Sequence, residues 1–483
     1  MSNEIRNLEP KALWNNFADL NAVPRPSKKE EKVRQFMVDF GNKLGLATQV
    51  DPIGNVIIKK PATKGMENRK PIVLQSHLDM VCQKNNDTEF DFDTQGINMF
   101  IDGDWVKAKG TTLGADNGIG VASIMSILES NNIEHPQIDA LFTIDEETGM
   151  TGAIGLQAGY LDGEILLNLD TEDDDEIGVG CAGGIDVTAT KKYTLIETSK
   201  KQKAFKITVK GLQGGHSGMD IHKGFGNANK MMNRILFAVK DVALISEIDG
   251  GSLRNAIPRE SNTIIVCEDE DKMGEIYNSI SEDIKTEYAS LEKDLIIQIA
   301  QANLPEFSMN NEEQELLLKG IYVAHNGVFR MSPDIEDLVE TSNNVARVIV
   351  KDGAIKIGCL TRSSIESGKM DLAYQLQNGF ELAGFNVELS GSYPGWKPNP
   401  DSAILKVMEG LYEKVFNEKP HILACHAGLE CGILGTNYPK MDMISFGPNI
   451  RGAHSPDERV SISSVQKYWP YLLETLKNIP LKE

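Results

Sequence analysis

The sequence has little that would hold a protein together by covalent cross-links. Its six cysteines are scattered over 483 residues, and no two of them form a CxxC pair. A disulfide framework or a thiolate zinc site is therefore not expected, and any metal would be held by histidine and carboxylate side chains. Scattered, reduced thiols are typical of a cytoplasmic protein, which is the location that we expect.

Basic residues and long apolar runs are scarce as well. Lysine and arginine total 49 against 70 aspartates and glutamates, which gives a formal net charge of −21. A chain with this charge repels nucleic acid. No apolar run approaches the length of a membrane span, and the start, MSNEIRNLEPKALWNNF, lacks the pattern of a signal peptide. The acid excess indicates either a solvated surface or carboxylates that converge on bound cations.

The length and the composition, 41% hydrophobic and 25% charged, are those of a globular protein with two or three domains. Strand and helix patterns alternate at first, which predicts an α/β fold with a mostly parallel sheet. After Gly184, VTATKKYTL and AFKITVKGL alternate strictly, as antiparallel strands do. The first pattern returns near Tyr393. We therefore expect an outer α/β domain of residues 1–186 and 393–483, and an inserted α+β domain of residues 187–392.

Helical spacing predicts the main helices of both domains. An internal repeat is also expected in the inserted domain, because GSLRNAIPRESNTIIVCED resembles TSNNVARVIVKDGAIKIGCLTRSS. Both segments read as asparagine-bearing loops that lead into a β-hairpin. The predicted helices span residues 8–20, 28–46, 117–131, 223–240, 270–292, 311–324, 401–416 and 462–477.

The first candidate site residues follow an apolar strand pattern, PIVLQSHLDMV. His77 and Asp79 stand two positions apart, so their side chains point the same way along a strand. His77 can bind a metal while Asp79 receives its other ring N–H, although an HxD pair by itself is weak evidence. Asp116 lies in a glycine-rich turn, GTTLGADNGIG, before a helical pattern. Alone it is best interpreted as a helix cap, and the alternative is a metal-bridging carboxylate.

Three successive acids, Asp145, Glu146 and Glu147, follow the buried strand pattern DALFTID. Acids clustered directly after an apolar strand are costly unless they are paired, solvated or bound to cations, so here a functional role is favoured. Because adjacent side chains cannot share one direction, one of Glu146 and Glu147 can bind a metal while the other transfers protons.

Two more candidates complete the set. Asp170 ends the apolar strand pattern EILLNLD, and His454 lies in a polar loop before the last helix. In open α/β sheets ligands collect beyond the carboxyl ends of the strands. An isolated loop histidine is more often a surface residue, but with His77 and a shared carboxylate His454 would complete a two-metal site.

Together, the segments SHLDMV, GADNG, DEETG, NLDTED, GGHSG and GAHSP resemble the family of two-zinc exopeptidases that includes carnosinase, peptidase T, aminoacylase and glutamate-releasing carboxypeptidases. The resemblance runs in order from His77 to Ser455. GCAGG, GGHSGMDIHKGFGNAN and AGLECG resemble the aminoacyl-histidine dipeptidase subgroup in particular. The resemblance implies a catalytic domain of residues 1–186 and 393–483 and a lid domain of residues 187–392.

The resemblance also implies two Zn²⁺ ions per subunit, for which Co²⁺ or Mn²⁺ are possible substitutes. Asp116 would bridge the two ions, Glu146 would be the general base that activates water, and Asp79 would orient His77. The implied metal ligands are His77, Asp116, Glu147, Asp170 and His454.

In the lid, His216 of GGHSG resembles the family histidine that stabilises the tetrahedral oxyanion, and the alternative is a glycine-rich turn with a solvent-facing histidine. Substrate binding would fall to Asn255 in the first lid half and to Arg362 and Asn344 in the second. Short-lid relatives are dimers that combine a histidine and an arginine from different subunits. We hypothesise that this duplicated lid supplies both from one chain.

The expected function is metal-dependent hydrolysis of dipeptides, including Xaa-His dipeptides such as β-alanyl-histidine. The guanidinium of Arg362 suits a free α-carboxylate. A related tripeptidase or N-acyl amino acid deacylase is the alternative within the family, and a non-catalytic metal-binding assembly protein is the alternative of another class. We expect a small peptide as substrate and no nucleic acid or membrane partner. The sequence does not decide whether the protein is a monomer or a homodimer.

Overall fold

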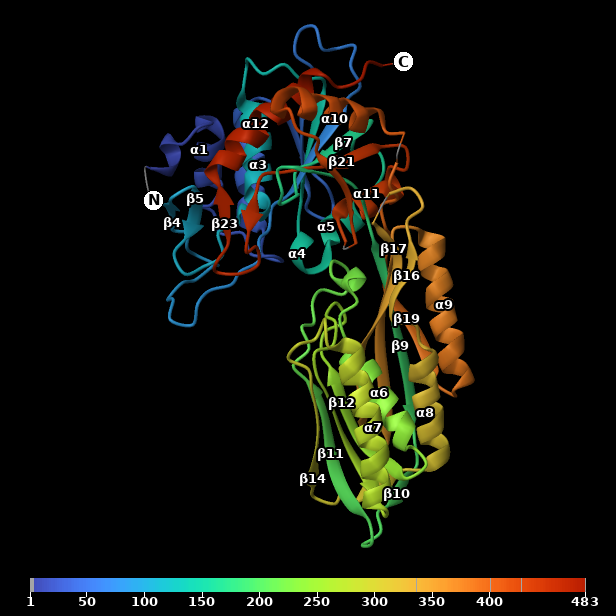
Figure 1. Ribbon diagram of the computed structural model, residues 1–483. Helices are drawn as coiled ribbons and strands as arrows, with labels where there is room; N and C mark the ends of the chain where they lie inside the picture. Colours follow the sequence, from blue (N-terminus) through green and yellow to red (C-terminus); the bar gives the residue numbers. More distant parts are fainter. Residues whose placement is uncertain (1–3, 336, 400, 427, 483) are drawn as a thin grey trace. The chain divides into compact units, whose positions relative to one another are not determined.

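The computed structural model describes residues 4–335, 337–399, 401–426 and 428–482 (Figure 1). The chain forms two compact units. Unit 1 comprises Met1–Gly180, Pro398–Ala424 and Glu430–Glu483, and unit 2 comprises Cys181–Lys397 and Cys425–Leu429. The sequence predicts boundaries at 186/187 and 392/393, and it gives no indication that residues 425–429 belong to unit 2.

Unit 1 is built on an eight-stranded sheet with a parallel centre. Strands β6, β3, β7 and β21 run parallel to one another, whereas β1, β2 and β8 pair antiparallel. This arrangement confirms the predicted α/β fold with a mostly parallel central sheet. The spatial order is β1 (Ala47–Val50), β2 (Val56–Lys60), β6 (Ile138–Thr143), β3 (Ile72–His77), β7 (Ile165–Asn168), β21 (Asp442–Ser445), β8 (Glu176–Cys181) and β20 (His421–Cys425).

The central strands of this sheet explain where its polar side chains lie. Every residue of IVLQSH in β3 and of IDALFT in β6 is buried. Near-continuous burial of this kind is typical of parallel strands that are covered on both faces. The acids and histidines therefore come at the strand ends: His77 ends β3, residues 145–147 follow β6, and Asp170 follows β7. Parallel strands bring these three ends to one edge of the sheet.

The helices of unit 1 pack around this sheet and around a smaller one. Trp14 and Phe17 of α1 share a buried cluster with Ile119 of α3 and Val465 of α12. A second sheet, with the order β22-β23-β5-β4, contributes to this cluster and is absent from the sequence prediction. Its strands are β4 (Met99–Asp102), β5 (Trp105–Ala108), β22 (Ile450–Arg451) and β23 (Arg459–Ser461). The helices are α1 (Lys11–Leu20), α2 (Glu31–Lys43), α3 (Ala115–Glu129), α4 (Glu146–Gly149), α5 (Thr151–Gly155), α10 (Ala403–Phe416), α11 (Glu430–Asn437) and α12 (Ile462–Lys477), with a 3-10 turn at Ile5–Asn7.

Unit 2 contains a nine-stranded sheet in which all recorded neighbours are antiparallel. The path is β14 (Ile296–Ala302), β11 (Lys203–Lys210), β13 (Ser261–Cys267), β12 (Ala243–Gly251), β17 (Val339–Lys351), β18 (Ala354–Ser363), β9 (Gly183–Lys192) and β19 (Asn386–Tyr393), with β16 (Gly327–Met331) paired to β17. A two-stranded sheet joins β10 (Leu195–Glu197) to β15 (Phe307–Met309). The helices are α6 (Ala228–Val239), α7 (Glu270–Tyr288), α8 (Asn311–Val323) and α9 (Glu366–Leu382), with a 3-10 turn at Ile221–Lys223.

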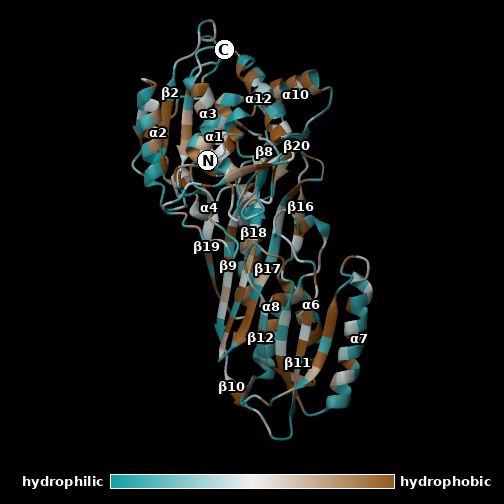
Figure 2. Ribbon diagram, turned by 90° about the vertical axis from the view of Figure 1, so that its left-hand side faces the viewer, coloured by the Kyte–Doolittle hydropathy of each residue, from teal (hydrophilic) through white to brown (hydrophobic). Residues whose placement is uncertain are grey.

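One face of each of these helices packs against the rest of unit 2. Figure 2 shows α7 as largely hydrophilic. Its buried residues, which include Met273, Tyr277 and Ile284, form a narrow row along one side of the helix. Spacings of four and seven residues place such a row on one side of a helix. The helix was predicted at residues 270–292 and is observed at Glu270–Tyr288.

The two halves of the nine-stranded sheet repeat one βαββαβ pattern. In chain order, the first repeat is β11, α6, β12, β13, α7 and β14, and the second is β9, α8, β17, β18, α9 and β19. The spatial order of the first, β14-β11-β13-β12, is mirrored by β17-β18-β9-β19, and the inner strands β12 and β17 meet at the seam. The topology agrees with the predicted duplication, and it shows the first repeat nested inside the second after β9.

One detail of the predicted repeat is wrong. Asn343 and Asn344 lie inside strand β17, opposite Thr361 and Leu360, and not in a loop. Asparagine in a buried strand is tolerated when its side chain is hydrogen-bonded. The amide of Asn343 donates to the carbonyl of His325 at 2.7 Å and accepts from the Thr361 hydroxyl at 2.9 Å. Asn255, by contrast, lies in the loop between β12 and β13 as predicted.

Across the described ranges, no helix has both the length and the apolar character that crossing a membrane requires.

Candidate metal centre

Among its described residues, unit 1 holds four groups of candidate ligand atoms. Two are His77 with Glu146 and Glu147, and Glu30 with Asp79 and Asp145, and the other two share Asp116. Of the two that share Asp116, one consists of His77, Asp116 and Asp170 and the other of Asp116, Glu147 and His454, with the ligand atoms of each group within 4.8 Å of one another. Nε2 of His77 lies 3.2 Å from Oδ1 of Asp116 and 3.6 Å from Oδ1 of Asp170. Nε2 of His454 lies 3.2 Å from Oδ2 of Asp116 and 3.1 Å from Oε2 of Glu147. Asp116 therefore offers one oxygen to each of these two groups.

The five residues reach this point from five separate segments. Asp116 stands in the first turn of α3, where its φ of −80° and ψ of 111° are not helical. Glu147 lies in the one-turn helix α4, and His454 lies in the hairpin between β22 and β23 with a φ of 63°. The side chain of His454 is 56% exposed, whereas that of Glu147 is 4% exposed. The cluster is thus most open at His454.

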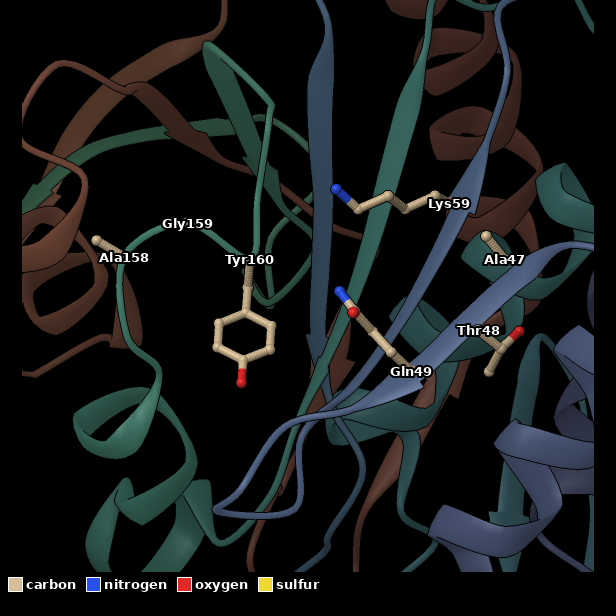
Figure 3. A pocket seen from close by; sticks show the side chains of 7 residues that line it. All are labelled: Ala47, Thr48, Gln49, Lys59, Ala158, Gly159 and Tyr160. Atoms are coloured by element: carbon tan, nitrogen blue, oxygen red, sulfur yellow. The ribbon is translucent and has the colours of Figure 1, made fainter.

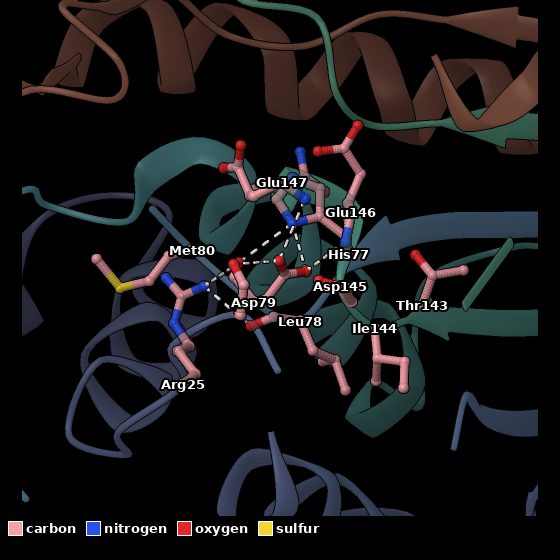
Figure 4. Close-up of polar contacts among 12 residues, drawn as sticks. Arg25, His77, Leu78, Asp79, Met80, Thr143, Ile144, Asp145, Glu146 and Glu147 are labelled. Carbon is pink, nitrogen blue, oxygen red and sulfur yellow. Dashed lines mark hydrogen bonds and ion pairs between the residues drawn. The ribbon is translucent and has the colours of Figure 1, made fainter. Parts of the chain in front are cut away.

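Asp79 connects the strand that carries His77 to the turn that carries the two glutamates (Figure 4). Its Oδ1 lies 3.4 Å from Nδ1 of His77 and accepts the Glu146 N–H at 3.0 Å, and its Oδ2 accepts the Glu147 N–H at 3.2 Å. The Ser27 hydroxyl also donates to it at 2.8 Å. Burial favours the neutral form of Asp79, but its contacts with His77, the Ser27 hydroxyl and the Glu146 N–H together prevail and lower its pKa. This geometry fits the predicted orienting role.

Burial and hydrogen bonding within the cluster change the pKa values of several of its groups. Burial opposes the charge on Asp116, but hydrogen bonds from His454 and His77 prevail and lower the Asp116 pKa. Hydrogen bonds to Asp116 and Glu147 raise the pKa of His454 to about 11. Burial raises the pKa of Asp170 to about 6 and that of Glu146 well above its usual value.

These side chains fit divalent cations. Four carboxylates, those of Asp116, Glu146, Glu147 and Asp170, face two imidazoles, and buried charge of one sign is costly without a counter-charge. Within the described residues, Oε1 of Glu147 is buried and has no hydrogen-bond partner. Imidazole and carboxylate donors without thiolates suit zinc, cobalt or manganese.

Sequence reasoning missed Glu430, which lies under the cluster. Glu430 is 1% exposed, and its Oε2 accepts hydrogen bonds of 2.6 Å from Gln75 and from Thr143. Gln75 in turn accepts from Asn168, and Asn168 accepts from Ser445. A buried polar network therefore crosses the four parallel strands just below the ligands. The one sequence feature that could have indicated Glu430 is that it is the acid of the AGLECG motif. The first residue of this motif, Ala427, lies outside the described residues.

Sequence reasoning also missed Arg25, a fully buried arginine shown in Figure 4. Its Nη1 donates to the carbonyls of Leu78 and Asp79, each at 3.1 Å, and its Nη2 donates to the carbonyl of Gly114 at 2.5 Å. Arg25 therefore ties the end of the His77 strand to the segment before Asp116. No sequence motif marks it, because it acts through backbone carbonyls.

The four predicted lid residues lie in unit 2, where the structure brings the His216 and Asn255 segments together. The Ser217 N–H donates to the carbonyl of Asn255 at 2.7 Å, and Asn255 itself is exposed. Asn344 is buried, and its amide donates to the carbonyls on either side of Asn255, those of Arg254 and Ala256. In this structure Asn344 supports the Asn255 loop, and its substrate contact stays a prediction.

Arg362 lies beside a second buried histidine that sequence reasoning missed. Its Nη1 donates to the Tyr393 hydroxyl at 2.8 Å, and within the described chain its buried Nε has no hydrogen-bond partner. His426 is 6% exposed and lies 2.8 Å from the Ser342 hydroxyl, on the residue paired with Arg362. Burial, and then the charge of Arg362, lowers the pKa of His426 to about 3. Burial and Arg362 also lower the pKa of His216.

A cavity of about 490 Å³ elsewhere in unit 1 holds none of these groups (Figure 3). Its one charged lining residue, Lys59, lies 2.6 Å from Asp162 and 3.7 Å from Asp139. It therefore offers neither a metal ligand nor a free base. It is lined by Ala47, Thr48, Gln49, Lys59, Ala158, Gly159 and Tyr160.

Comparison with known proteins finds similar sequences and structures. The profile of Peptidase family M20/M25/M40 matches residues 73–478. The chain is 45% identical over 484 residues to the cytosol non-specific dipeptidase of Escherichia coli K12, with 99% of this chain and 100% of the relative covered. The crystal structure of aminoacylhistidine dipeptidase from Vibrio alginolyticus superposes with a TM-score of 0.94 at 46% identity and 99% coverage of both chains. Aminopeptidase PepT from Bacillus cereus shares the fold, with a TM-score of 0.58 at 16% identity.

Proposed function

This chain belongs to Peptidase family M20/M25/M40, and from that premise we propose that it is a metal-dependent dipeptidase whose reaction takes place at the His77–His454 cluster. One observation carries the proposal. The two oxygens of Asp116 lie 3.2 Å from Nε2 of His77 and 3.2 Å from Nε2 of His454, so one carboxylate serves two ligand groups. Such sharing is what a pair of neighbouring cations requires.

We propose that His77 and Asp170 hold one ion, that Glu147 and His454 hold the other, and that Asp116 bridges them. Zinc is the proposed metal, at two ions per subunit. When bound, the ions would supply Lewis acidity that polarises the scissile carbonyl and makes an attacking water more acidic. The donor set and the partnerless Oε1 of Glu147 support this assignment.

Glu146 is the proposed general base. It stands next to Glu147 on a turn that Asp79 fixes through both backbone N–H groups. Burial raises the pKa of Glu146, so its carboxylate gains affinity for a proton. A carboxylate of this kind can take a proton from water and return it to the leaving amine. Asp79 is proposed to keep His77 and this turn in register.

His216 is the proposed donor to the developing oxyanion. Its Nδ1 accepts the N–H groups of Gly218 at 3.2 Å and Met219 at 3.1 Å, so the ring proton belongs on Nε2. Its lowered pKa keeps the ring neutral, with Nε2–H free to donate. Arg362, together with Asn255, is proposed to bind the α-carboxylate of the substrate, because a guanidinium pairs with a carboxylate through two parallel hydrogen bonds.

Dipeptides are the proposed substrate class. The Escherichia coli relative is named for dipeptides and the Vibrio alginolyticus relative for aminoacyl-histidines, and both are similar to this chain over nearly its whole length. We therefore propose broad dipeptide hydrolysis that includes Xaa-His dipeptides. A cytoplasmic location is proposed from the name of the first relative and from the scattered cysteines.

The test combines elemental analysis with a substrate panel. Purified protein is expected to contain about two divalent metal ions per chain and to hydrolyse β-alanyl-histidine and other dipeptides. Tripeptides and N-acetyl amino acids are expected to be poor substrates. Preference for either of those would support the tripeptidase or deacylase alternative instead. Protein that holds two metal ions and cleaves nothing on the panel would rule out an enzyme.

A further inference from the structure

An acidic residue of the His454 loop, Glu458, contacts the segment that carries Asp116. Glu458 is 2% exposed and stands four residues after His454. The N–H groups of residues 113–116 all donate to its carboxylate, two to each oxygen, at 2.7 to 3.1 Å. One buried side chain thus accepts from four successive backbone donors.

The local sequence cannot supply this cap. The N-cap of α3 is Gly114, which has no side chain and adopts a φ of 71°. A Cβ at Gly114 would lie 2.4 Å from Nη2 of Arg25, and the positive φ strains any residue that has a side chain. The first N–H groups of a helix lack partners within the helix and carry a positive partial charge. Glu458 satisfies them from a segment more than 340 residues away in the chain.

These hydrogen bonds also hold the backbone of Asp116. Its own N–H is one of the four donors, and its backbone departs from helical geometry. Its side chain reaches His77 with one oxygen and His454 with the other, both at 3.2 Å. A small rotation of this backbone would move both oxygens at once, so both contacts depend on how firmly residues 113–116 are held.

We propose that Glu458 is a positioning residue that holds Asp116 between the two histidines, so that one hairpin loop both presents His454 and fixes the shared carboxylate. The inference deepens the proposed function and rests on it for the identity of the bound ions. The four hydrogen bonds from residues 113–116 to Glu458 do not depend on a metal, so this part of the proposal applies to metal-free protein as well.

The first experiment measures metal affinity in Glu458→Gln. The amide nitrogen of glutamine donates and cannot accept, so the substitution replaces two accepted hydrogen bonds with opposed donors at nearly constant volume. Zinc affinity, measured by competition with a chromogenic chelator, is expected to fall about 10- to 100-fold, the range typical of residues that support metal ligands. Unchanged affinity would overturn the proposal.

The matched control is Glu292→Gln in unit 2. Glu292 is 3% exposed and accepts the N–H groups of Gln213 at 2.8 Å and Gly226 at 2.7 Å. Its substitution removes a comparable buried acceptor and is expected to lower stability with no change in zinc affinity. If both variants lost zinc equally, the effect of Glu458→Gln would be general destabilisation and the proposal would fail.

A double-mutant cycle tests whether Glu458 acts through Asp116. Both residues are in contact, so their effects are expected to be coupled. In an Asp116→Asn background, adding Glu458→Gln should change zinc affinity by less than about twofold, because the carboxylate that it positions is already gone. A full additional 10-fold loss would show that Glu458 acts by another route.

A third measurement separates this inference from the proposed function. In metal-free protein, hydrogen exchange of the amides of residues 113–116 is expected to be at least 10-fold faster in Glu458→Gln than in the natural chain. Equal exchange rates would contradict the proposal that Glu458 holds the backbone of residues 113–116. If the natural chain bound no metal while these rates differed, the proposed function would fail and the positioning of Asp116 by Glu458 would stand.

Discussion

Glu146 and Glu147 are neighbours in the chain with different surroundings. The Oε2 of Glu147 lies 3.1 Å from Nε2 of His454. Glu146 is grouped with His77 and Glu147, and burial raises its pKa. The two carboxylates therefore have separate tasks in the proposed mechanism, one as a ligand and the other as a base.

Glu146→Gln should lower kcat about 10²- to 10⁴-fold, the contribution typical of a general base, because glutamine cannot accept the proton of water. The content of two metal ions should not change. The measurement is kcat for a dipeptide together with elemental analysis. Glu164→Gln is the control, since Glu164 is an exposed acid of unit 1 paired with Lys70 at 3.6 Å. Loss of metal in Glu146→Gln would make Glu146 a ligand instead.

His426 supplies a prediction about pH. Its pKa is lowered to about 3 by burial, so the folded chain binds no proton there until the pH approaches that value. The unfolded chain binds one near pH 6.5. Between these values the unfolded state holds more protons, so the free energy of unfolding decreases as the pH falls. His426→Asn, which removes the titrating group and keeps a polar partner for Ser342, should weaken that decrease by about 1 kcal/mol between pH 7 and pH 5.5.

The measurement is urea denaturation of both proteins at the two pH values. The variant and the natural chain share every other titrating group, so the difference between their pH dependences isolates residue 426. Parallel pH dependences would show that His426 is not buried in its neutral form.

At the scale of elements, the N-cap residues of α6 and α7 in unit 2 differ in burial and in the number of hydrogen bonds that they make. Asn227 caps α6 by accepting from the N–H groups of Asn229 and Lys230, and its amide also donates to Asn326 at 2.8 Å. Asp269 caps α7 through one bond to the N–H of Lys272. Asn227 is 3% exposed, whereas Asp269 lies at the surface.

Alanine at the two caps should therefore have different costs. Asp269→Ala should lower the free energy of unfolding by about 1 kcal/mol, the usual value of an N-cap. Asn227→Ala should cost about 2 to 3 kcal/mol, because it also leaves buried polar groups without partners. Denaturant titration of both variants gives the comparison, and equal costs would mean that the buried contacts of Asn227 contribute nothing.

Element prediction from sequence succeeded where one periodicity dominates. The buried runs of β3 and β6 and the one-sided pattern of α7 were all predicted near their observed bounds. The pairing of β22 and β23 with β5 was not, because strands of two or three residues carry too short a pattern to recognise. The placement of Asn344 failed for another reason: its hydrogen bonds to Arg254 and Ala256, which let it enter a strand, join distant segments.

At the scale of the whole molecule, the two units should respond differently to metal removal. Every cluster of histidine and acid ligand atoms found in the described chain lies in unit 1. A ligand stabilises the folded state to which it binds. Chelation should therefore increase deuterium uptake in residues 72–79, 113–118 and 450–458, and leave residues 339–351 and 354–363 unchanged. An equal increase in both units would contradict a metal site confined to unit 1.

The nested duplication of unit 2 leads to a prediction about subunits. His216 belongs to the first repeat and Arg362 to the second, yet both influence His426 in one chain. Inactive His216→Ala and inactive Arg362→Ala, mixed under conditions that exchange subunits, should therefore recover no dipeptidase activity. Recovered activity would mean that the two residues act from different chains, as in the short-lid relatives.

The sequence by itself determined the order of the main helices and buried strands, the two-part organisation and the residue types available for a metal site. It could do so because periodicity, strand-end acids such as residues 145–147 and spaced motifs are local properties of the chain. Tertiary structure alone decided that Asp116 faces both His77 and His454, that Glu430 and Arg25 support the cluster, and that Glu458 caps α3. These contacts join segments far apart in sequence through backbone amides, carbonyls and buried polar groups, whose pairing depends on the folded arrangement and leaves no local pattern.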